Sequence, residues 1–499
     1  MTSYDEILYP GRLYPDTHPD RLGTTATLFG MRPAPVERCR VLEIACGDAA
    51  NLIPMAYGLP GSEFVGFDLA GGPIETGKEM ARRLGLANLS LSQCDLAEFP
   101  AAAGQFDYIV AHGLYSWVPA PVRDALLALI AARLTPSGVA FVSYNVYPGC
   151  YARRMLWEML RFHTDHLEDP RARIDEARAL ARMLRGGRRT EDEQATLLAL
   201  EAGRLLERDP AFLFHDDLSE VNEPVYFHQF IEHAADHDLQ FLGEAELKIM
   251  GYGGLTQEAA RVLESMEPLA REQYLDFLRC RRFRQTLLCR SAVQLDRQLG
   301  PEKLEHMLLG MRARVKVHEE SGVAPEAEAL RDQENGANAH SDETLLQAIL
   351  DVLTDVAPEL LTPADLMRRV GEGAAADILK QRGPMVLRQL TLGAVRVGAI
   401  ELHLHAARLT VEPSERPVAN PIARLQLETD NIVSSLCHDS VRLDDEIAAS
   451  ILKLLDGTRD RAALLAALSD RLKGDGPTAR AETLEAHLRS FGKLGLLAA

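Results

Sequence analysis

Acidic side chains stand in or beside the ends of three successive predicted strands, where they could bind a polar ligand. These residues are Glu43, Asp68 and Asp95. A carboxylate about 20 residues past a tight turn, as Asp68 is, can accept hydrogen bonds from ribose hydroxyls. A second acid one strand over can hold an adenine amino group. One such acid alone is more often a helix cap or a loop residue, but three in succession indicate a ligand site.

A turn of small residues follows the first of these acids. The segment Arg40–Asn51 is typical of a buried strand, a tight turn and the start of a helix. Such a turn lets backbone N–H groups and a helix N-terminus approach a bound ligand. Strand–turn–helix units also occur in many α/β folds that bind nothing there, so the turn gains its meaning from the acids that follow.

The positions of the acids and of the turn follow from a regular alternation of predicted strands and helices that begins at residue 40. We predict strands at 41–45, 64–67, 89–93, 108–111 and 139–144, and helices at 51–57, 74–84 and 121–134. The alternation predicts an α/β fold, with a parallel sheet covered by helices on both faces. In such sheets ligands bind beyond the carboxyl ends of the strands, beside the point where the strand order reverses.

The segment 41–145 resembles the class I S-adenosylmethionine-dependent methyltransferases, which implies a Rossmann-like sheet. Their motif of an acid and three alternate glycines corresponds here to Glu43, Ala45, Gly47 and Ala49, so alanine replaces glycine twice. The turn must therefore accommodate two Cβ atoms. The absence of a GxGxxG sequence argues against NAD as the ligand.

The resemblance implies S-adenosyl-L-methionine as the cofactor and assigns a role to each part of the site. Gly47 and its neighbours lie against the methionine part, and Asp68 binds the ribose. Asp95 and Leu96 frame the adenine, and His112 contacts the cofactor through its backbone or ring. The predicted cofactor-binding residues are Glu43, Ala45, Cys46, Gly47, Asn51, Asp68, Leu69, Asp95, Leu96 and His112.

A narrower resemblance covers about residues 1–295. The strings that carry it are 18–22, 51–56, 113–119, 143–149 and 283–288. They are similar to bacterial methyltransferases with a methyltransferase regulatory domain, some of which are protein lysine methyltransferases acting on bacterial surface (outer-membrane) proteins. The resemblance implies a protein substrate and methylation of lysine.

Transfer of a methyl group to lysine requires orientation and removal of a proton from the ammonium, whose ordinary pKa is about 10.4. A tyrosine or histidine within hydrogen-bond reach could accept that proton. Tyr115 and Tyr144 follow or end the fourth and fifth strands, where the methyl group is expected, and we predict that they are catalytic. Trp117 and Tyr147 lie nearby. The alternative is that these aromatic rings only pack the loops.

The sequence predicts no metal site. Seven cysteines show no CxxC pair and no Cys/His ligand spacing. His163 with His166, and His233 with His237, have helical spacing but no third ligand in view. Solvated or capped histidines are the simpler interpretation of both pairs.

Composition limits the partners. A formal charge of −19 and the lack of an Asn/Asp-Pro-Pro-Tyr-type loop argue against nucleic acid. No apolar run approaches the roughly 20 residues of a membrane span. Sparse cysteines and a start without a signal pattern favour a cytoplasmic protein without membrane partners.

The pattern divides the chain into five parts. We predict a cofactor-binding core with an N-terminal arm at 1–150, a helical insertion at 151–214 and a regulatory-domain segment completing the sheet at 215–295, then a middle domain at 296–415 and a helical domain at 416–499. The insertion could cap the substrate or form a homodimer contact.

The two C-terminal domains are expected to be small and mainly α-helical. Helices at 345–353, 363–370 and 374–390, followed by paired short strands in 394–405, suggest a winged-helix-like unit. An acidic connection at 319–343 precedes it. Neither domain carries a basic stripe, so protein contact is favoured over DNA.

Three functions remain open on sequence alone. The first is a lysine-directed protein methyltransferase. The second is a small-molecule methyltransferase on the same fold, and the third is a regulatory protein that binds S-adenosylmethionine without transferring its methyl group.

Overall fold

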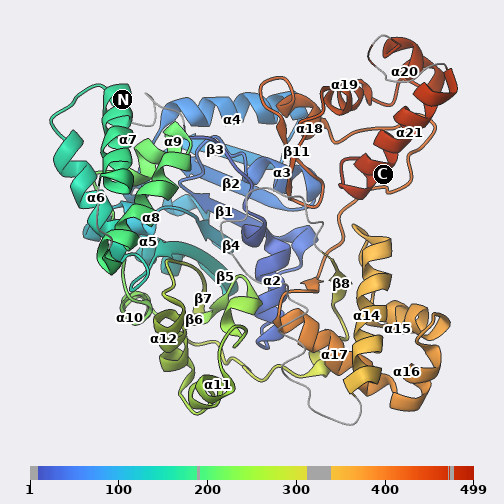
Figure 1. The fold of residues 1–499 in the computed structure, drawn as a ribbon, viewed down its shortest axis with the longest axis horizontal. Helices are drawn as coiled ribbons and strands as arrows, with labels where there is room; N and C mark the ends of the chain where they lie inside the picture. Colours follow the sequence, from blue (N-terminus) through green and yellow to red (C-terminus); the bar gives the residue numbers. More distant parts are fainter. Residues whose placement is uncertain (1–8, 188–191, 312–338, 470, 472–476) are drawn as a thin grey trace.

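The computed structural model describes residues 9–187, 192–311, 339–469, 471 and 477–499 (Figure 1). Most of the predicted connection at 319–343 lies outside these ranges. Within them, none of the helices has both the length and the apolar composition needed to cross a bilayer. The seven cysteines, all in this part of the chain, are free thiols.

A seven-stranded mixed sheet forms the centre, in the order β3-β2-β1-β4-β5-β7-β6. Its strands are β1 (Arg40–Ile44), β2 (Glu63–Asp68), β3 (Leu89–Gln93), β4 (Phe106–Ala111), β5 (Leu134–Asn145), β6 (Leu239–Glu244) and β7 (Phe283–Arg290). Strands β1 to β5 are parallel, and β7 is antiparallel to both of its neighbours. The α/β prediction is confirmed, and the strand order reverses between β1 and β4.

Helices cover both faces of the sheet because its central strands are buried on both sides. One face packs against α5 (Ala120–Arg133) and α10 (Phe227–Ala235), which contribute Leu126, Ile130 and Phe230 to its apolar cluster. The other face packs against helices that include α2 (Pro19–Leu28) and α3 (Leu52–Gly58). Helix α4 (Gly71–Leu84) connects β2 to β3.

The insertion after β5 consists of α6 (Tyr151–Thr164), α7 (Pro170–Gly186) and α8 (Glu193–Glu207), which share an apolar cluster of their own. After it, α9 (Pro210–Phe212) and a π-helical turn lead to α10. Two helices follow β6, α11 (Gln257–Glu264) and α12 (Pro268–Arg279). Pro268, which lacks a backbone N–H, begins the second one.

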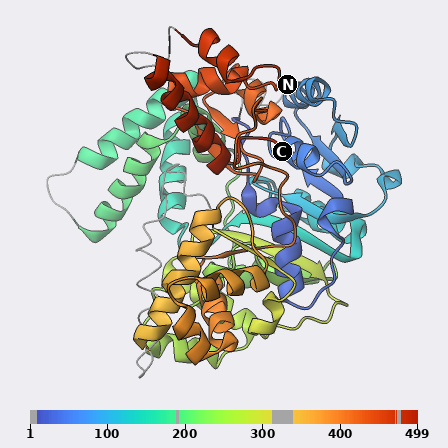
Figure 2. The same cartoon turned by 90° about the vertical axis from the view of Figure 1, so that its right-hand side faces the viewer.

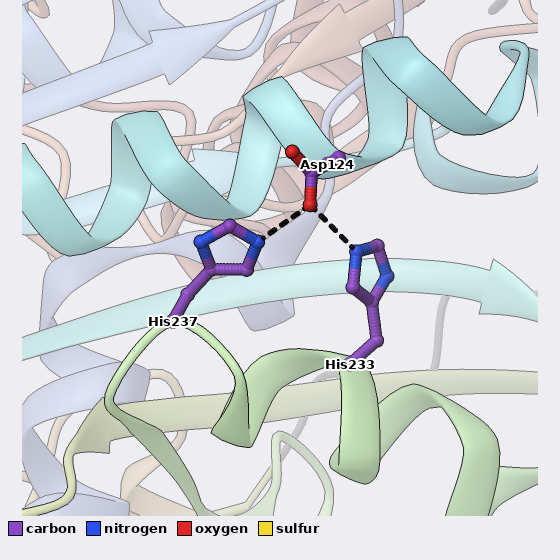
Figure 3. A group of neighbouring side chains, drawn as sticks. All are labelled: Asp124, His233 and His237. Atoms are coloured by element: carbon purple, nitrogen blue, oxygen red, sulfur yellow. Dashed lines mark hydrogen bonds and ion pairs between the residues drawn. The ribbon is translucent and has the colours of Figure 1, made fainter.

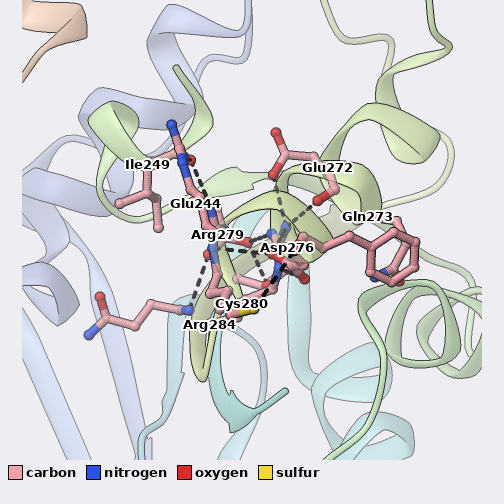
Figure 4. Close-up of polar contacts among 12 residues, drawn as sticks. Glu244, Ile249, Glu272, Gln273, Asp276, Arg279, Cys280 and Arg284 are labelled. Atoms are coloured by element: carbon pink, nitrogen blue, oxygen red, sulfur yellow. Dashed lines mark hydrogen bonds and ion pairs between the residues drawn. The ribbon is translucent and has the colours of Figure 1, made fainter. Parts of the chain in front are cut away.

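Arg284 of β7 ties these later elements together from a fully buried position (Figure 4). Its guanidinium makes two hydrogen bonds of 2.9 Å to Asp276 of α12, and further ones to Glu244 of β6 and Glu272 of α12. Glu244 also accepts a hydrogen bond from Thr286. Buried carboxylates are stable only when paired in this way, so Arg284 holds β6, β7 and α12 in register.

The middle part contains α14 (Ala339–Val356), α15 (Pro363–Glu372), α16 (Ala376–Arg382) and α17 (Pro384–Arg396), with the strands β8 (Leu308–Gly310) and β9 (Glu401–His403). The predicted helix at 374–390 breaks at Gly383, where φ is +82°. The paired short strands predicted within 394–405 were wrong, because α17 runs to Arg396 and β9 pairs with β8 instead.

The C-terminal part has an apolar cluster of its own. It contains α18 (Pro421–Gln426), the hairpin β10 (Ile432–Ser434) and β11 (Ser440–Arg442), α19 (Glu446–Leu454), α20 (Arg461–Ala467) and α21 (Pro477–Lys493). The hairpin was not predicted. Figures 1 and 2 show the middle and C-terminal parts against different regions of the central sheet.

Candidate functional site

The turn between β1 and α3 has an unusual backbone. Ala45, Gly47 and Ala49 all adopt the left-handed conformation, with φ of +57°, +55° and +58°. For alanine this conformation costs roughly 1–2 kcal/mol. A Cβ on Gly47 would meet no atom within 4 Å, so the space in front of this backbone is open. Strain kept beside an open space is typical of a ligand-binding turn.

Asp68, at the end of β2, joins this turn. Its carboxylate accepts hydrogen bonds from the backbone N–H of Gly47 at 2.9 Å and of Ala70 at 2.8 Å. A carboxylate has about four acceptor positions, so it keeps capacity for two ligand hydroxyls. The geometry places Asp68 where a ribose could lie against the turn.

Glu43 is 4% exposed and lies beneath the turn. Its Oε1 accepts a hydrogen bond from Asn51 at 2.8 Å, whereas Oε2 is buried without a hydrogen-bond partner in the structure. Burial raises the pKa of this carboxyl from 4.5 to about 7, and the nearby Asp48 and Asp68 charges add to the rise. A cationic group on a ligand would satisfy the unpartnered oxygen.

Asn51 connects three separate segments of the chain beside the turn. Its Oδ1 accepts from the backbone N–H of Tyr14 and lies 3.0 Å from Nε2 of His438. Its amide donates to Thr17 and Glu43. Two acceptor and two donor positions are thereby occupied, so Asn51 positions its neighbours around the turn.

The remaining predicted adenine-side residues follow β2 and β3. The N–H of Cys94 donates to the carbonyl of Asp68, which brings the two strand ends together. Asp95 is exposed and accepts from the N–H of Ala97, so it also caps a short helical turn. Leu96 is half-buried, and Leu69 is 56% exposed. These apolar side chains at the strand ends are suited to the faces of a flat base.

His112, after β4, stacks on Tyr14 with ring centroids 3.6 Å apart. Burial lowers the pKa of His112 to about 4, so its imidazole is neutral. Tyr14 belongs to the N-terminal arm. Its described part packs on the site through Tyr14 and Thr17, whereas Tyr4 lies outside the described residues.

The geometry contradicts the catalytic roles predicted for Tyr115 and Tyr144. Their side chains are 2% and 1% exposed and pack against Phe230 of α10. The hydroxyl of Tyr115 is 2.9 Å from His233 Nδ1, and that of Tyr144 is 2.9 Å from Thr286 Oγ1. Burial raises the pKa of Tyr115 to about 12, so its hydroxyl stays protonated at neutral pH and the phenolate that could accept a proton is not available. Both tyrosines pack the core beneath the site.

Three other tyrosines contact one another at the surface, near the carboxyl end of β5. Tyr147 stacks on Tyr151 with centroids 4.2 Å apart, and the Tyr226 ring lies 5.5 Å from that of Tyr147. The hydroxyls of Tyr151 and Tyr226 are 3.1 Å apart, and Tyr151 is 54% exposed. We call these residues the tyrosine cluster. Tyr147 has a sequence signal, its place after the fifth strand, but Tyr151 and Tyr226 have none.

His438 was also missed. It lies in the loop between β10 and β11, 387 residues from Asn51, and is 5% exposed. Its ring centroid is 5.1 Å from that of His18. No local pattern could connect a loop of the C-terminal part with a turn near the N-terminus.

Three family models match the chain. They are described as a methyltransferase domain, over residues 41–138, a predicted methyltransferase regulatory domain, over 209–290, and a PKMT C-terminal winged helix domain, over 415–485. The winged-helix match therefore falls in the C-terminal part, whereas the sequence suggested such a unit in the middle part.

Similar proteins come from Rickettsia. The uncharacterized protein RP789 of Rickettsia prowazekii is 35% identical over 304 residues, which are 60% of this chain and 55% of that protein. The uncharacterized protein RP028 of the same species is 34% identical over 241 residues, 48% of this chain and 96% of that protein. The chain thus spans about half the length of the first relative.

The solved structure of PKMT2 from Rickettsia typhi is similar over 98% of this chain and 100% of that one, with a TM-score of 0.83 and 26% sequence identity. The same protein has been solved in complex with AdoHcy, with the same degree of similarity.

Proposed function

Because the chain belongs to the class I S-adenosylmethionine-dependent methyltransferases, we propose that it transfers methyl groups to lysine side chains of a protein substrate. The observation that carries the proposal is the similarity to PKMT2 over nearly the whole chain, since that name abbreviates protein lysine methyltransferase. The winged-helix match adds a second PKMT resemblance, in the C-terminal part.

The residues of the turn fit the methyl donor. The unpartnered, buried Oε2 of Glu43 complements the ammonium of a methionine moiety, and the open space at Gly47 leaves room for the chain that follows. Asp68 would hold the ribose, with Leu69, Asp95 and Leu96 around the base. S-Adenosyl-L-methionine supplies an electrophilic methyl group on a sulfonium, so the protein's share is orientation and exclusion of water.

The tyrosine cluster supports a lysine acceptor. Aromatic faces stabilise a nearby ammonium by roughly 0.5–2 kcal/mol, which suits the approach of a lysine side chain. Tyr151 offers an exposed face for this contact. Tyr147 of this cluster lies two residues after the end of β5. The carboxyl ends of β1 to β4, which carry the proposed donor site, lie at the same edge of the sheet as this end of β5.

Transfer of labelled methyl groups tests this proposal. The purified protein, with S-adenosylmethionine labelled in the methyl group, is added to a bacterial lysate, which is then separated into protein, nucleic acid and small molecules. We expect label in protein, and acid hydrolysis should release it as methylated lysine. Label confined to small molecules would favour the second hypothesis, and donor binding without any transfer would favour a regulatory protein.

A further inference from the structure

A group of three potential metal ligands lies between α5 and α10, apart from the proposed donor site. Nε2 of His237 is 2.9 Å from Oδ1 of Asp124, and Nε2 of His233 is 3.4 Å from the same oxygen (Figure 3). One ligand atom from each of the three residues lies within 4.8 Å of the others. His233 is on α10, His237 lies two residues after the end of that helix, and Asp124 is on α5.

The sequence offered only the histidine pair, without a third ligand. The structure supplies Asp124, 109 residues before His233. In the other pair, by contrast, His163 lies 3.2 Å from Glu176 of the insertion, a single hydrogen-bond contact. The fold thus brings the Asp124 carboxylate beside His233 and His237, which the spacing of the histidines in the sequence could not reveal.

The spacing suits a transition metal. Ligand atoms placed about 2.0–2.1 Å from a tetrahedral ion stand roughly 3.4 Å from each other. The distances from Asp124 Oδ1 are 2.9 Å to His237 and 3.4 Å to His233, at or below that value, so small side-chain rotations would close the set. Two imidazoles and one carboxylate are ligands that zinc, nickel and cobalt ions accept.

A hydrogen bond to Tyr115 orients the His233 side chain as a metal ligand. Nδ1 of His233 is 2.9 Å from the hydroxyl oxygen of Tyr115, which is buried. When Nδ1 carries the proton and donates it to this oxygen, the lone pair of Nε2 points toward Asp124. Ligand histidines usually have such a fixed outer hydrogen bond. The side chains of His233, His237 and Asp124 are 25%, 17% and 64% exposed, which leaves an open side for water ligands.

The net charge permits a divalent cation. Asp124 contributes a negative charge, and the two histidines bind an ion in their neutral form. The nearby Arg123 guanidinium lies over the Tyr115 ring, at 5.5 Å from its centroid, and 4.0 Å from Glu223. Its charge is therefore partly balanced by a carboxylate.

We infer that Asp124, His233 and His237 form a binding site for a divalent transition-metal ion of the zinc type, completed by water. The ion would join α5, in the segment matched by the methyltransferase domain model, to α10, in the segment matched by the regulatory domain model. Through His233 it would also fix Tyr115 and hence the loop that follows β4. This inference does not depend on the identity of the methyl acceptor.

Metal titration of the full chain tests the site. Metal-stripped protein is titrated with Zn²⁺ by calorimetry, and with Co²⁺ by absorption, because a nitrogen–oxygen site gives visible bands without the strong near-ultraviolet absorption of a thiolate. We expect one site per chain. Loss of one ligand in His237→Ala or Asp124→Asn should weaken binding by about 100-fold or more.

His163→Ala is the matched control, since it removes a partly exposed helical histidine that also faces a carboxylate. It should bind Zn²⁺ like the wild type. Circular dichroism shows whether each variant is folded, and His237→Gln provides a conservative second variant at the site. Equal binding by wild type, His237→Gln and Asp124→Asn would overturn the inference, as would a thiolate spectrum or no binding to the folded wild type.

Discussion

Glu43 gives the most informative prediction. Ionisation of its buried carboxyl lowers the stability of the fold, and the same carboxylate is proposed to bind the ammonium of the methyl donor. Burial raises its pKa from 4.5 to about 7. At 1.36 kcal/mol per pH unit, ionising it in the folded protein costs ~3 kcal/mol. Between these two pH values the folded state binds more protons than the unfolded state. The free energy of unfolding therefore falls as pH rises through this window.

Glu43→Gln removes the titrating group, so the variant should gain stability relative to wild type as pH rises. Between pH 5 and pH 8 the relative gain should be ~2–3 kcal/mol. Any pH-independent cost of a buried amide cancels in this difference. Urea unfolding at both pH values measures it, with fluorescence of the two tryptophans, Trp117 and Trp157, as the signal.

Glu75→Gln is the control, because this glutamate on α4 has a side chain that is 72% exposed. It should show no comparable pH-dependent difference. The Glu43→Gln variant should also bind S-adenosylmethionine at least about tenfold more weakly, since it lacks a negative charge opposite the ammonium. A relative stability of Glu43→Gln that is equal at pH 5 and pH 8 would refute the reasoning.

Three further predictions concern the turn, the buried arginine and the tyrosine cluster. Ala45→Gly should be more stable than Ala50→Gly by about 1 kcal/mol in urea unfolding, because Ala50 is a half-buried alanine of the same turn whose φ is not positive. Equal stability of the two variants would contradict backbone strain at Ala45. Arg284→Met leaves buried carboxylates unpaired and should cost roughly 3–5 kcal/mol, whereas the exposed Arg82→Met should cost under about 0.5 kcal/mol. Under the proposed function, Tyr151→Ala should raise KM for the protein substrate several-fold while Tyr151→Phe keeps it, and an unchanged KM in both would remove the cluster from the acceptor site.

The central sheet was predictable from the sequence because its signals are local. The alternating pattern of strands and helices predicted β1 to β5, and the acids Asp68 and Asp95 lie at strand ends by virtue of position alone. The sequence predicted a turn that accommodates the Cβ atoms of Ala45 and Ala49. In the structure both alanines adopt the left-handed backbone conformation.

Contacts between distant parts were not predictable. Tyr115 and Tyr144 occupy expected loop and strand positions, but α10 covers them, and nothing near them in sequence indicates that helix. His438 and Asp124 contact partners that are 387 and 113 residues away in the sequence. The contacts of Asn51 were not predictable for the same reason, since its partners come from three separate segments.

Calorimetric titration with S-adenosylmethionine tests the proposed donor site most directly. Asp68→Ala removes a carboxylate that accepts the Gly47 N–H at 2.9 Å, and Asp107→Ala removes one that accepts the Arg40 N–H at 2.9 Å at the opposite end of the same sheet. Wild type and Asp107→Ala should bind the donor alike, and Asp68→Ala should bind it at least about tenfold more weakly. Equal affinity of all three proteins, or a larger loss in Asp107→Ala, would contradict a donor site at the carboxyl ends of β1 and β2.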